Sequence, residues 1–452
     1  MAIYSTSTKG IGGQIKRRYT DFIVEEIQRD GKVCEAKRFV KEFGEQESAG
    51  IQQNLETAEQ LHLETEKLIV PQNLEDREQL HLDLEKINRD TNFVIRDITR
   101  FIQCSGKRIG YAGMKDKRAV TCQRISIFRP NVERLQQFSS RGIQLRNPFW
   151  EKERIDLGML LGNKFTVTIR DLQLEEKELK KRIAAFFKEA EKNGIANYFG
   201  EQRFGGIRNI THVVGKEFLK GDFRNGVMLY LCHAAEGEEE EVAAARKRLA
   251  ETNDFAEATR LFPPKFRYER AMIHHLCRFP NDFVGAFGRL PKKLRYLFTH
   301  AYQSHLFNKI IEERFSQGIG LKNVEGDILE EGNPTAALFG FESQFAEGKA
   351  GEIERKVLNA DGIELQQFKV KKMAEISSKG ARKSIVLKPE KMGLLEIKED
   401  EFFPEKLCAK ISFELSKGNY ATTVLAELMK IGQNGNEKPE NCSAELMKAD
   451  EK

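Results

Sequence analysis

Several short segments of the chain are rich in apolar residues or alternate them with polar ones, a pattern that predicts β-strands. The alternation is clearest in Ala119–Phe128 and Lys164–Arg170, where successive side chains would point to opposite faces of a sheet. Arg17–Ile27 and Leu407–Leu415 have the same character. Each of these widely separated segments is predicted to be a strand.

Longer segments repeat their apolar residues every three to four positions, which predicts amphipathic helices. In Glu175–Asn193 the apolar side chains share one face, and Asn193-Gly194 ends the helix with residues that tolerate a positive φ. A second helix is predicted to begin with Asp90 or Thr91 as its N-cap. Further helices are predicted at Glu236–Ala250, Leu294–Arg314 and Ala421–Ile431.

The organisation of the chain shows one internal echo. The sequence NLETAEQLHLETEKL from Asn54 returns as NLEDREQLHLDLEKI from Asn73, which predicts a helical hairpin or an extra arm, since two copies are too few for a solenoid. Arg29–Ala49, rich in Lys, Glu and Gly, is expected to be an exposed loop. A separate domain is expected over roughly Thr211–Lys383, and the polar tail from Gln433 is expected to be disordered.

The composition favours a globular protein without a membrane span. Of the 452 residues, 40% are hydrophobic and 32% are charged, and no apolar run approaches the roughly 20 residues that a spanning helix needs. The first residues lack the apolar core of a signal peptide. Seven scattered cysteines without a CxxC pair predict no disulfide framework, so a cytoplasmic location is expected. The net charge of +5 is too small to indicate nucleic-acid binding by itself.

Common motifs for nucleotide, metal and serine-nucleophile chemistry are absent from the sequence. It contains no GxxxxGK[ST], GxGxxG, HExxH or GxSxG segment. His300 and His305 are five residues apart, off a common helical face, and His274-His275 with Cys277 has no second ligand pair nearby. Neither a metal nor another cofactor is expected.

The segment YAGMKDKRAVT places Asp116 in a turn before a predicted strand, among the cations Lys115, Lys117 and Arg118. Opposite charges nearby favour the ionised carboxylate. A carboxylate that stays ionised on a rigid turn can act as a nucleophile or as a base. From the residue types alone, an ordinary charged loop tip remains the alternative.

Two aromatic segments are the other candidates for chemistry. In NYFGEQRFGG (Asn197–Gly206), rings alternate with Arg203, a composition suited to stacking on unpaired bases while the guanidinium meets phosphate. Phe199 and the neighbouring rings could equally be core residues. In KGNYATTVLAE, Tyr420 precedes a predicted helix, where a core or capping role is the alternative.

Taken together, these segments resemble the TruD family of pseudouridine synthases. The matching motifs follow the order of the family over nearly the whole chain. They are DFIVEE (Asp21–Glu26), HLDLEKINRDT (His81–Thr91), AGMKDKRAVT (Ala112–Thr121), LGNKF (Leu161–Phe165), NYFGEQRFGG (Asn197–Gly206), HAYQSHLFN (His300–Asn308) and GNYATTVLAEL (Gly418–Leu428).

The resemblance implies an α/β (α+β) fold with a mixed or antiparallel sheet. The catalytic domain would comprise residues 1–210 and 385–452, with an insertion at about 34–79, and residues 211–384 would form an inserted TRUD domain. It implies isomerisation of uridine to pseudouridine, typically at position 13 of tRNA. The implied partner is tRNA, with no cofactor, metal, membrane or obligate protein partner.

The resemblance also implies roles for particular residues. Asp116 would be the nucleophile on a flipped-out uridine, and Lys115 would be its charge partner. Phe199 would stack on the target uracil and Asn197 would hydrogen-bond in the pocket. Tyr420 would be the aromatic residue that packs on the active site.

Three further residues are expected at the substrate or RNA: Glu26 of the DFxVxE motif, Lys117 and Arg203. The sequence also departs from the family pattern. Glu151–Asp156 is more acidic than an RNA-facing edge should be, and Asn419 stands where serine is commoner. A non-catalytic RNA-binding or RNA-chaperone protein with the same fold is the alternative function, and a scaffold built on the middle domain is a third.

Overall fold

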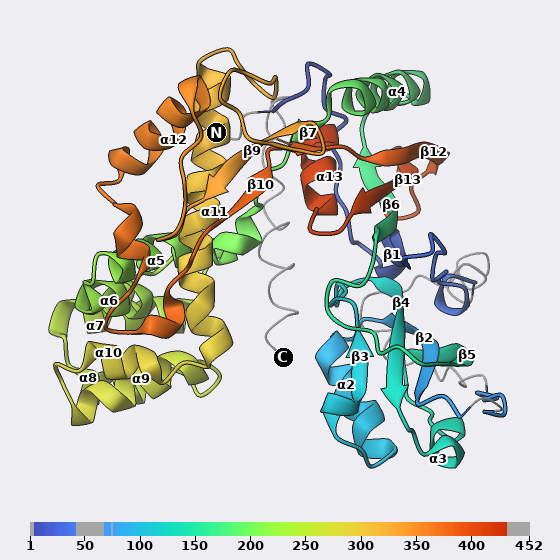
Figure 1. Ribbon diagram of the computed structural model, residues 1–452, viewed down its shortest axis with the longest axis horizontal. Helices are drawn as coiled ribbons and strands as arrows, with labels where there is room; N and C mark the ends of the chain where they lie inside the picture. Colours follow the sequence, from blue (N-terminus) through green and yellow to red (C-terminus); the bar gives the residue numbers. More distant parts are fainter. Residues whose placement is uncertain (1–3, 42–66, 74–75, 432–452) are drawn as a thin grey trace. The chain divides into compact units, whose positions relative to one another are not determined.

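The computed structural model describes residues 4–41, 67–73 and 76–431, which form two compact units (Figure 1). The sheet unit takes its described residues from 8–192 and 388–431, and the helical unit takes them from 4–7 and 193–387. The first copy of the echo and the tail from Gln433 lie outside the described residues, apart from residues 67 and 68 of that copy. The assignment of the units as catalytic and TRUD domains stays a prediction.

The sheet unit is built on a mixed eight-stranded sheet, which confirms the predicted fold class. Its strands are β1 (Phe22–Ile27), β2 (Gln79–Ile87), β3 (Ile109–Tyr111), β4 (Val120–Phe128), β5 (Ile143–Glu151), β6 (Gly162–Leu172), β12 (Glu390–Glu399) and β13 (Leu407–Ser416). The order is β12-β13-β6-β1-β4-β2-β5, with β3 paired to β4. β1 and β4 are parallel, and the other neighbours are antiparallel.

β2 shows that the helical interpretation of the second echo copy is wrong. Leu80, Leu82 and Leu84 alternate with polar residues and are fully buried on one face of the sheet. β2 pairs with β4 on one side and β5 on the other, so it is an interior strand. The period of two in LHLDL decides the structure, whereas the similarity of the two copies suggested a shared helical form.

Residues 34–41 also differ from the predicted exposed loop. Phe39 is buried against Ile23 and Val120. The backbone N–H groups of residues 37, 38 and 39 donate to the carboxylate of Glu85. Burial raises the pKa of Glu85, although Arg146 lies 2.6 Å from its carboxylate. The segment is ordered because its backbone N–H groups provide hydrogen bonds to the buried Glu85 carboxylate, and the sequence pattern does not reveal this contact.

Among the described residues of the sheet unit, the longer helices lie where the apolar spacing predicts them, and the short helix Val132–Gln136 was not predicted. The helices are α2 (Thr91–Phe101), α3 (Val132–Gln136), α4 (Glu176–Asn193) and α13 (Ala421–Met429). The Asp90 carboxylate caps α2 by accepting the N–H groups of residues 92 and 93. The buried face of α2, with Val94 and Ile98, packs on the leucines of β2.

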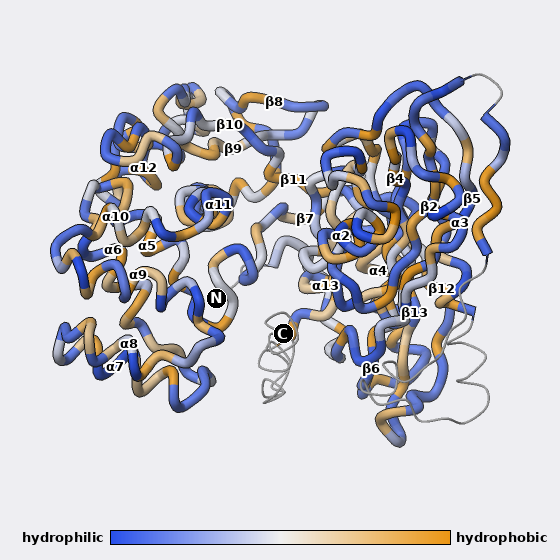
Figure 2. The backbone as a smooth tube through the Cα atoms, turned by 90° about the horizontal axis from the view of Figure 1, so that it is seen from below, coloured by the Kyte–Doolittle hydropathy of each residue, from blue (hydrophilic) through white to orange (hydrophobic). Residues whose placement is uncertain are grey.

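The helical unit is a bundle with two small sheets. Its helices are α5 (Thr211–Leu219), α6 (Phe223–Cys232), α7 (Glu240–Thr252), α8 (Phe255–Leu261), α9 (Arg267–Arg278), α10 (Phe283–Gly288), α11 (Lys292–Ser316) and α12 (Gly348–Ala360). Its strands are β7 (Ile195–Ala196), β8 (Leu329–Glu330), β9 (Asn333–Leu338), β10 (Ala381–Ser384) and β11 (Val386–Leu387). Hydrophobic and hydrophilic stretches alternate along the chain of this unit (Figure 2). Nowhere in the described ranges is a helix long and apolar enough to cross a membrane.

A buried ionic cluster joins the distant segments of the sheet unit. Arg170 of β6 donates to Asp21 before β1 (Nη2 to Oδ1, 2.7 Å) and to Asp400 after β12 (Nη1 to Oδ1, 3.2 Å). These three side chains are at most 4% exposed. Glu401 lies 3.0 Å from the same guanidinium. One cation therefore connects three regions of the chain that the sheet brings together.

Replacement of Arg170 by alanine is expected to lower the free energy of unfolding by about 3–5 kcal/mol, because it leaves two carboxylates buried without their cation. Lys180→Ala is the control, since it removes an exposed pair with Glu176 on α4 and should change the same quantity by less than about 0.5 kcal/mol. Urea unfolding at pH 7, followed by circular dichroism, measures both. Similar small losses in the two variants would contradict the role given to the cluster.

Candidate active site

The loop between β3 and β4 carries Asp116, and side chains from neighbouring elements fix its backbone. Gln123 of β4 donates to the carbonyl of Gly113 at 2.9 Å. Thr91, in the first turn of α2, accepts a hydrogen bond from the N–H of Lys115 at 3.2 Å. Hydrogen bonds from β4 and from α2 therefore hold the loop at the residues just before Asp116.

Lys86, at the end of β2, provides a further contact to the loop. Its ammonium donates to the carbonyl of Asp116 at 2.7 Å and to that of Lys115 at 3.4 Å. Burial lowers the pKa of Lys86 to about 8. No motif in the sequence singles out Lys86, because it is an ordinary lysine at the end of a strand.

Lys115 and Glu26 form a buried ion pair. The Lys115 ammonium lies 2.6 Å from Glu26 Oε2, and the two side chains are only 3% and 2% exposed. Glu26 Oε1 accepts the N–H of Arg124 at 3.2 Å. The expected charge partner of Asp116 therefore binds Glu26 with its ammonium, and the geometry favours positioning roles for both members of this pair.

The carboxylate of Asp116 points out of this framework and is 47% exposed. Its Oδ1 lies 3.5 Å from the ammonium of Lys16, whose side chain is 10% exposed. The same ammonium lies 4.1 Å from the ring centroid of Phe22. Lys16 was also missed, because one lysine in GQIKRRYTDF has no spacing that would single it out.

The turn before α13 is linked to the Asp116 loop through residues 157–161. The N–H of Gly158 donates to Ala112 at 2.8 Å, and the N–H of Lys417 donates to Leu161 at 2.9 Å. The Lys417 ammonium also donates to the carbonyl of Gly158 at 3.3 Å. Tyr420, at the N-cap of α13, is 47% exposed. Its ring is thus available on a turn that this segment ties to the loop.

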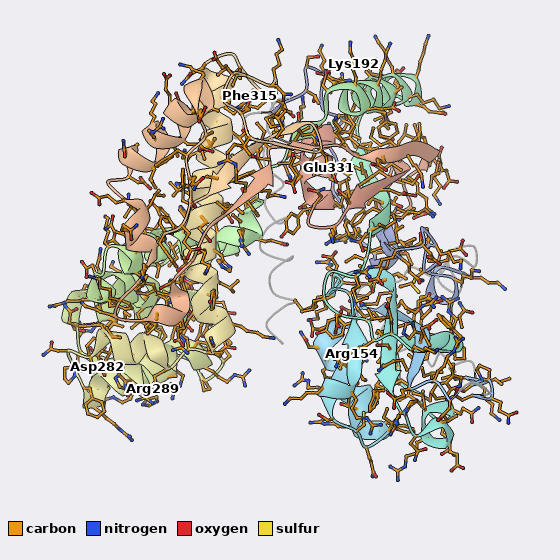
Figure 3. The ribbon with its side chains drawn as sticks, viewed as in Figure 1. Arg154, Lys192, Asp282, Arg289, Phe315 and Glu331 are labelled. Carbon is orange, nitrogen blue, oxygen red and sulfur yellow. The ribbon has the colours of Figure 1, made fainter. Side chains whose placement is uncertain are left out.

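The acidic segment Glu151–Asp156 contains two cations, Lys152 and Arg154, beside its three acids. Arg154, labelled in Figure 3, donates to the carbonyl of Ile109 at 3.3 Å and lies 3.4 Å from Asp156. Arg154 therefore offsets part of the negative charge beside β3.

Asn197 and Phe199 follow β7 in the helical unit. Asn197 is buried and donates from Nδ2 to the carbonyl of Ser384 at 3.0 Å. The N–H of Phe199 donates to Asn308 Oδ1 and its carbonyl accepts from Asn308 Nδ2, both at 2.9 Å. The half-buried Phe199 ring contacts Phe307 edge to face, 5.4 Å between centroids. Two residues of HAYQSHLFN on α11 therefore hold Phe199, a role that the motif alone did not reveal.

Two cations lie near the Phe199 ring. The Arg203 guanidinium and the Lys383 ammonium are each 5.6 Å from its centroid. Arg203 also donates from Nε to Ser304 Oγ on α11 at 3.1 Å. Burial lowers the pKa of Lys383 to about 8. Lys383 of β10 was not predicted, because no aromatic or glycine motif surrounds it in the sequence.

The predicted site residues thus fall into two groups. The sheet unit contains Glu26, Lys115, Asp116, Lys117 and Tyr420, and the helical unit contains Asn197, Phe199 and Arg203. Within residues 4–41, 67–73 and 76–431, no three His, Cys, Asp or Glu side chains cluster in a way that could hold a metal ion.

Comparison with known proteins finds one family along the chain. The family model described as tRNA pseudouridine synthase D (TruD) matches residues 1–334 and 330–428. A probable tRNA pseudouridine synthase D of Methanococcoides burtonii is 36% identical, and that of Methanosarcina acetivorans is also 36% identical; each match covers 95% of both chains. The crystal structure of a protein described as TruD from Methanosarcina mazei is similar, with a TM-score of 0.75 and 34% identity over 95% of this chain and 96% of that one.

The buried ion pair between Glu26 and Lys115 is expected to contribute to the free energy of unfolding. Glu26→Ala should lower the free energy of unfolding by about 3–5 kcal/mol, because an uncompensated ammonium stays buried. Asp30→Ala, which removes the exposed partner of Lys32, should cost less than about 1 kcal/mol.

The double variant Glu26→Gln with Lys115→Met should recover most of that loss, because no buried charge remains and the introduced amide keeps an acceptor for the N–H of Arg124. Chemical denaturation of the wild type and the three variants measures these differences. A double variant as unstable as Glu26→Ala would show that charge burial is not the cause.

Proposed function

The chain belongs to the TruD family, and on that basis we propose that it is a tRNA pseudouridine synthase that isomerises uridine at position 13 of tRNA. The enzyme class is an isomerase acting on tRNA, since the family model and the relatives that match nearly the whole chain are described as tRNA pseudouridine synthase D. The proposal extends to the target position and to the roles of single residues.

The reaction breaks the N-glycosidic bond of uridine, turns the freed uracil and rejoins it to the ribose through C5. The uracil loses the proton on C5 and gains one on N1, and no electrons are exchanged with another molecule. The reaction therefore needs a polar group at the ribose or base and a means of retaining the base. The target must also leave its stack, which costs a few kcal/mol.

Asp116 is the group that meets the first need. The observation that carries the proposal is that its carboxylate is 47% exposed while the backbone around it is held by Gln123, Thr91 and Lys86. A fixed carboxylate can attack the nucleoside to form a covalent intermediate or remove a proton from it, and both routes use the same oxygen atoms. Lys16 supplies a positive charge 3.5 Å from one carboxylate oxygen.

Aromatic residues meet the second need. Phe199 is proposed to stack on the target uracil and Asn197 to hydrogen-bond to it, while Tyr420 contributes a second exposed ring. Stacking contributes about 1–3 kcal/mol per base, enough to offset extrusion of the nucleotide. Arg203 and Lys117 are proposed to contact phosphate, and Lys115 and Glu26 to position the Asp116 loop.

Asp116→Asn is expected to lower pseudouridine formation at least about a thousandfold while tRNA affinity stays within about threefold, because only the reacting group is lost. Asp30→Asn is the matched control, an exposed aspartate paired with one lysine, and should retain full turnover. Product is measured by the release of tritium from tRNA whose uridines carry tritium at C5, and the modified position is mapped by sequencing. Multiple turnover by Asp116→Asn would rule out the assigned role, and wild-type RNA binding without product would favour the non-catalytic alternative.

Phe199→Ala is expected to lower kcat/KM roughly 5- to 150-fold, which corresponds to the loss of one stacked base. Phe315→Ala is the matched control, a half-buried phenylalanine packed on the same core and marked in Figure 3. Both variants should keep the circular dichroism spectrum of the wild type. An unfolded Phe199→Ala protein would support the core interpretation instead.

A further inference from the structure

An exposed aromatic side chain on α2 lies close to the Asp116 loop and is not used by the proposed mechanism. Phe93 is 40% exposed, although its neighbours Val94 and Ile95 are buried in the core. The position is the third of the helix, two residues after Thr91, which binds the backbone of Lys115. A single exposed ring is common on protein surfaces, so the groups around Phe93 decide what it can bind.

Two arginines accompany this ring. The guanidinium of Arg89 is 5.8 Å and that of Arg96 is 5.7 Å from the centroid of Phe93. Arg96 and Arg100 are exposed on successive turns of α2, and neither has an ion-pair partner among the described residues. The surface of the helix therefore offers cations whose charge is not already neutralised by carboxylates.

The two acidic residues of the segment from 89 to 100 offset only part of this positive charge. The Asp90 carboxylate is occupied by the two N–H groups that it caps, and Asp97 is the other acid of the segment. Against these stand Arg89, Arg96 and Arg100. With three arginines against two aspartates, the segment from 89 to 100 carries a net charge of +1.

The patch is continuous with the Asp116 loop. Asn92 donates from Nδ2 to the sulfur of Met114 at 3.3 Å and accepts a hydrogen bond from the hydroxyl of Tyr111 at 3.4 Å. Met114 is 65% exposed and lies two residues before Asp116. The exposed surface therefore runs from the carboxylate over Met114 to Phe93.

We propose that Phe93, Arg89, Arg96 and Arg100 form an RNA-binding strip, on which a nucleotide neighbouring the target uridine stacks while the guanidiniums bind its phosphates. A ring flanked by guanidiniums is the arrangement that binds unpaired nucleotides, because the ring stacks on any base and the planar cation pairs with phosphate oxygens. The arginines are complementary to the negative phosphates of RNA, and the strip is continuous with the surface around Asp116, so RNA is the proposed ligand of the strip. The inference rests on the proposed function only for the identity of the RNA.

The test compares Phe93→Ala and Arg96→Gln with wild type, using full-length protein and unmodified tRNA transcript. The Kd for tRNA and the KM should each rise about tenfold for Phe93→Ala, with kcat unchanged, because a stacked base is lost beside the reacting one. For Arg96→Gln, the slope of log affinity against log salt should become shallower by about 0.7–0.9, the value of one phosphate contact.

Two variants on the same unit are matched controls. Phe149→Ala removes a comparable ring, which is 38% exposed and has the Arg124 guanidinium 4.7 Å from its centroid. Phe149 lies opposite His81 of β2, on the other face of the sheet from the buried leucines that contact α2. Arg129→Gln removes an exposed arginine just after β4, at the end of this strand away from Asp116. Both should leave Kd, KM and the salt slope unchanged.

The outcomes separate this inference from the proposed function. If wild type forms pseudouridine and the α2 variants match the controls in Kd and KM, the strip does not bind RNA and the enzyme assignment stands. If wild type binds tRNA through Phe93 and Arg96 but forms no pseudouridine, the strip stands and the enzyme assignment fails. Unchanged melting temperatures in all variants ensure that affinity, and not folding, is measured.

Discussion

The buried ion pair between Lys115 and Glu26 is the interaction on which the candidate site depends. Lysine and glutamate are rarely so fully enclosed unless they are paired, because each charge loses its hydration on burial. The pair ties the loop before β4 to β1, the strand parallel to it. Because Lys115 points inward, its neighbour Asp116 points outward, so one enclosed contact determines which of two adjacent charged residues reaches solvent.

The environment of the site follows from the order of the strands. β1 lies between β4 and β6, and this places Lys16 and Glu26, from the start of the chain, beside a loop about 100 residues later. β2 brings Lys86 to the other side of the same loop. Lys16 and Lys86, the cations that contact Asp116, are thus distant from it in the sequence, whereas the sequence analysis considered only the cations beside it in the chain.

Much of the fold was predictable, because periodicity reports burial directly. The strands at 119–128, 164–170 and 407–415 and the helices at 90–102, 175–193 and 294–314 were predicted and are present. Two errors have a physical cause. The similarity of the two NLE…QLHL segments suggested a helix where the second segment forms the strand β2. The segment around Phe39 was predicted to be an exposed loop, but hydrogen bonds to Glu85 order it, and no local pattern indicates this long-range contact.

For the candidate site, the sequence motifs predict Asp116, Phe199 and Tyr420, and the structure shows what surrounds each of them. Lys16, Lys86, Lys383 and Asn308 could not be found in the same way, because each is an ordinary residue whose importance arises only from what lies next to it in space. The role of Lys115 as charge partner of Asp116, which the resemblance implies, stays a prediction, and the structure adds Glu26 as a partner of Lys115 that no motif indicates.

The position of β13 between β6 and β12 has a consequence for synthesis of the protein on the ribosome. β6 is complete by residue 172, but its neighbour β13 begins at residue 407, after the entire helical unit has been made. At about 5–20 residues per second, the open edge of β6 waits on the order of 10–50 s for its partner. During that interval an unpaired, apolar strand edge is exposed to other nascent chains, so the growing polypeptide depends on shielding that the finished enzyme no longer needs.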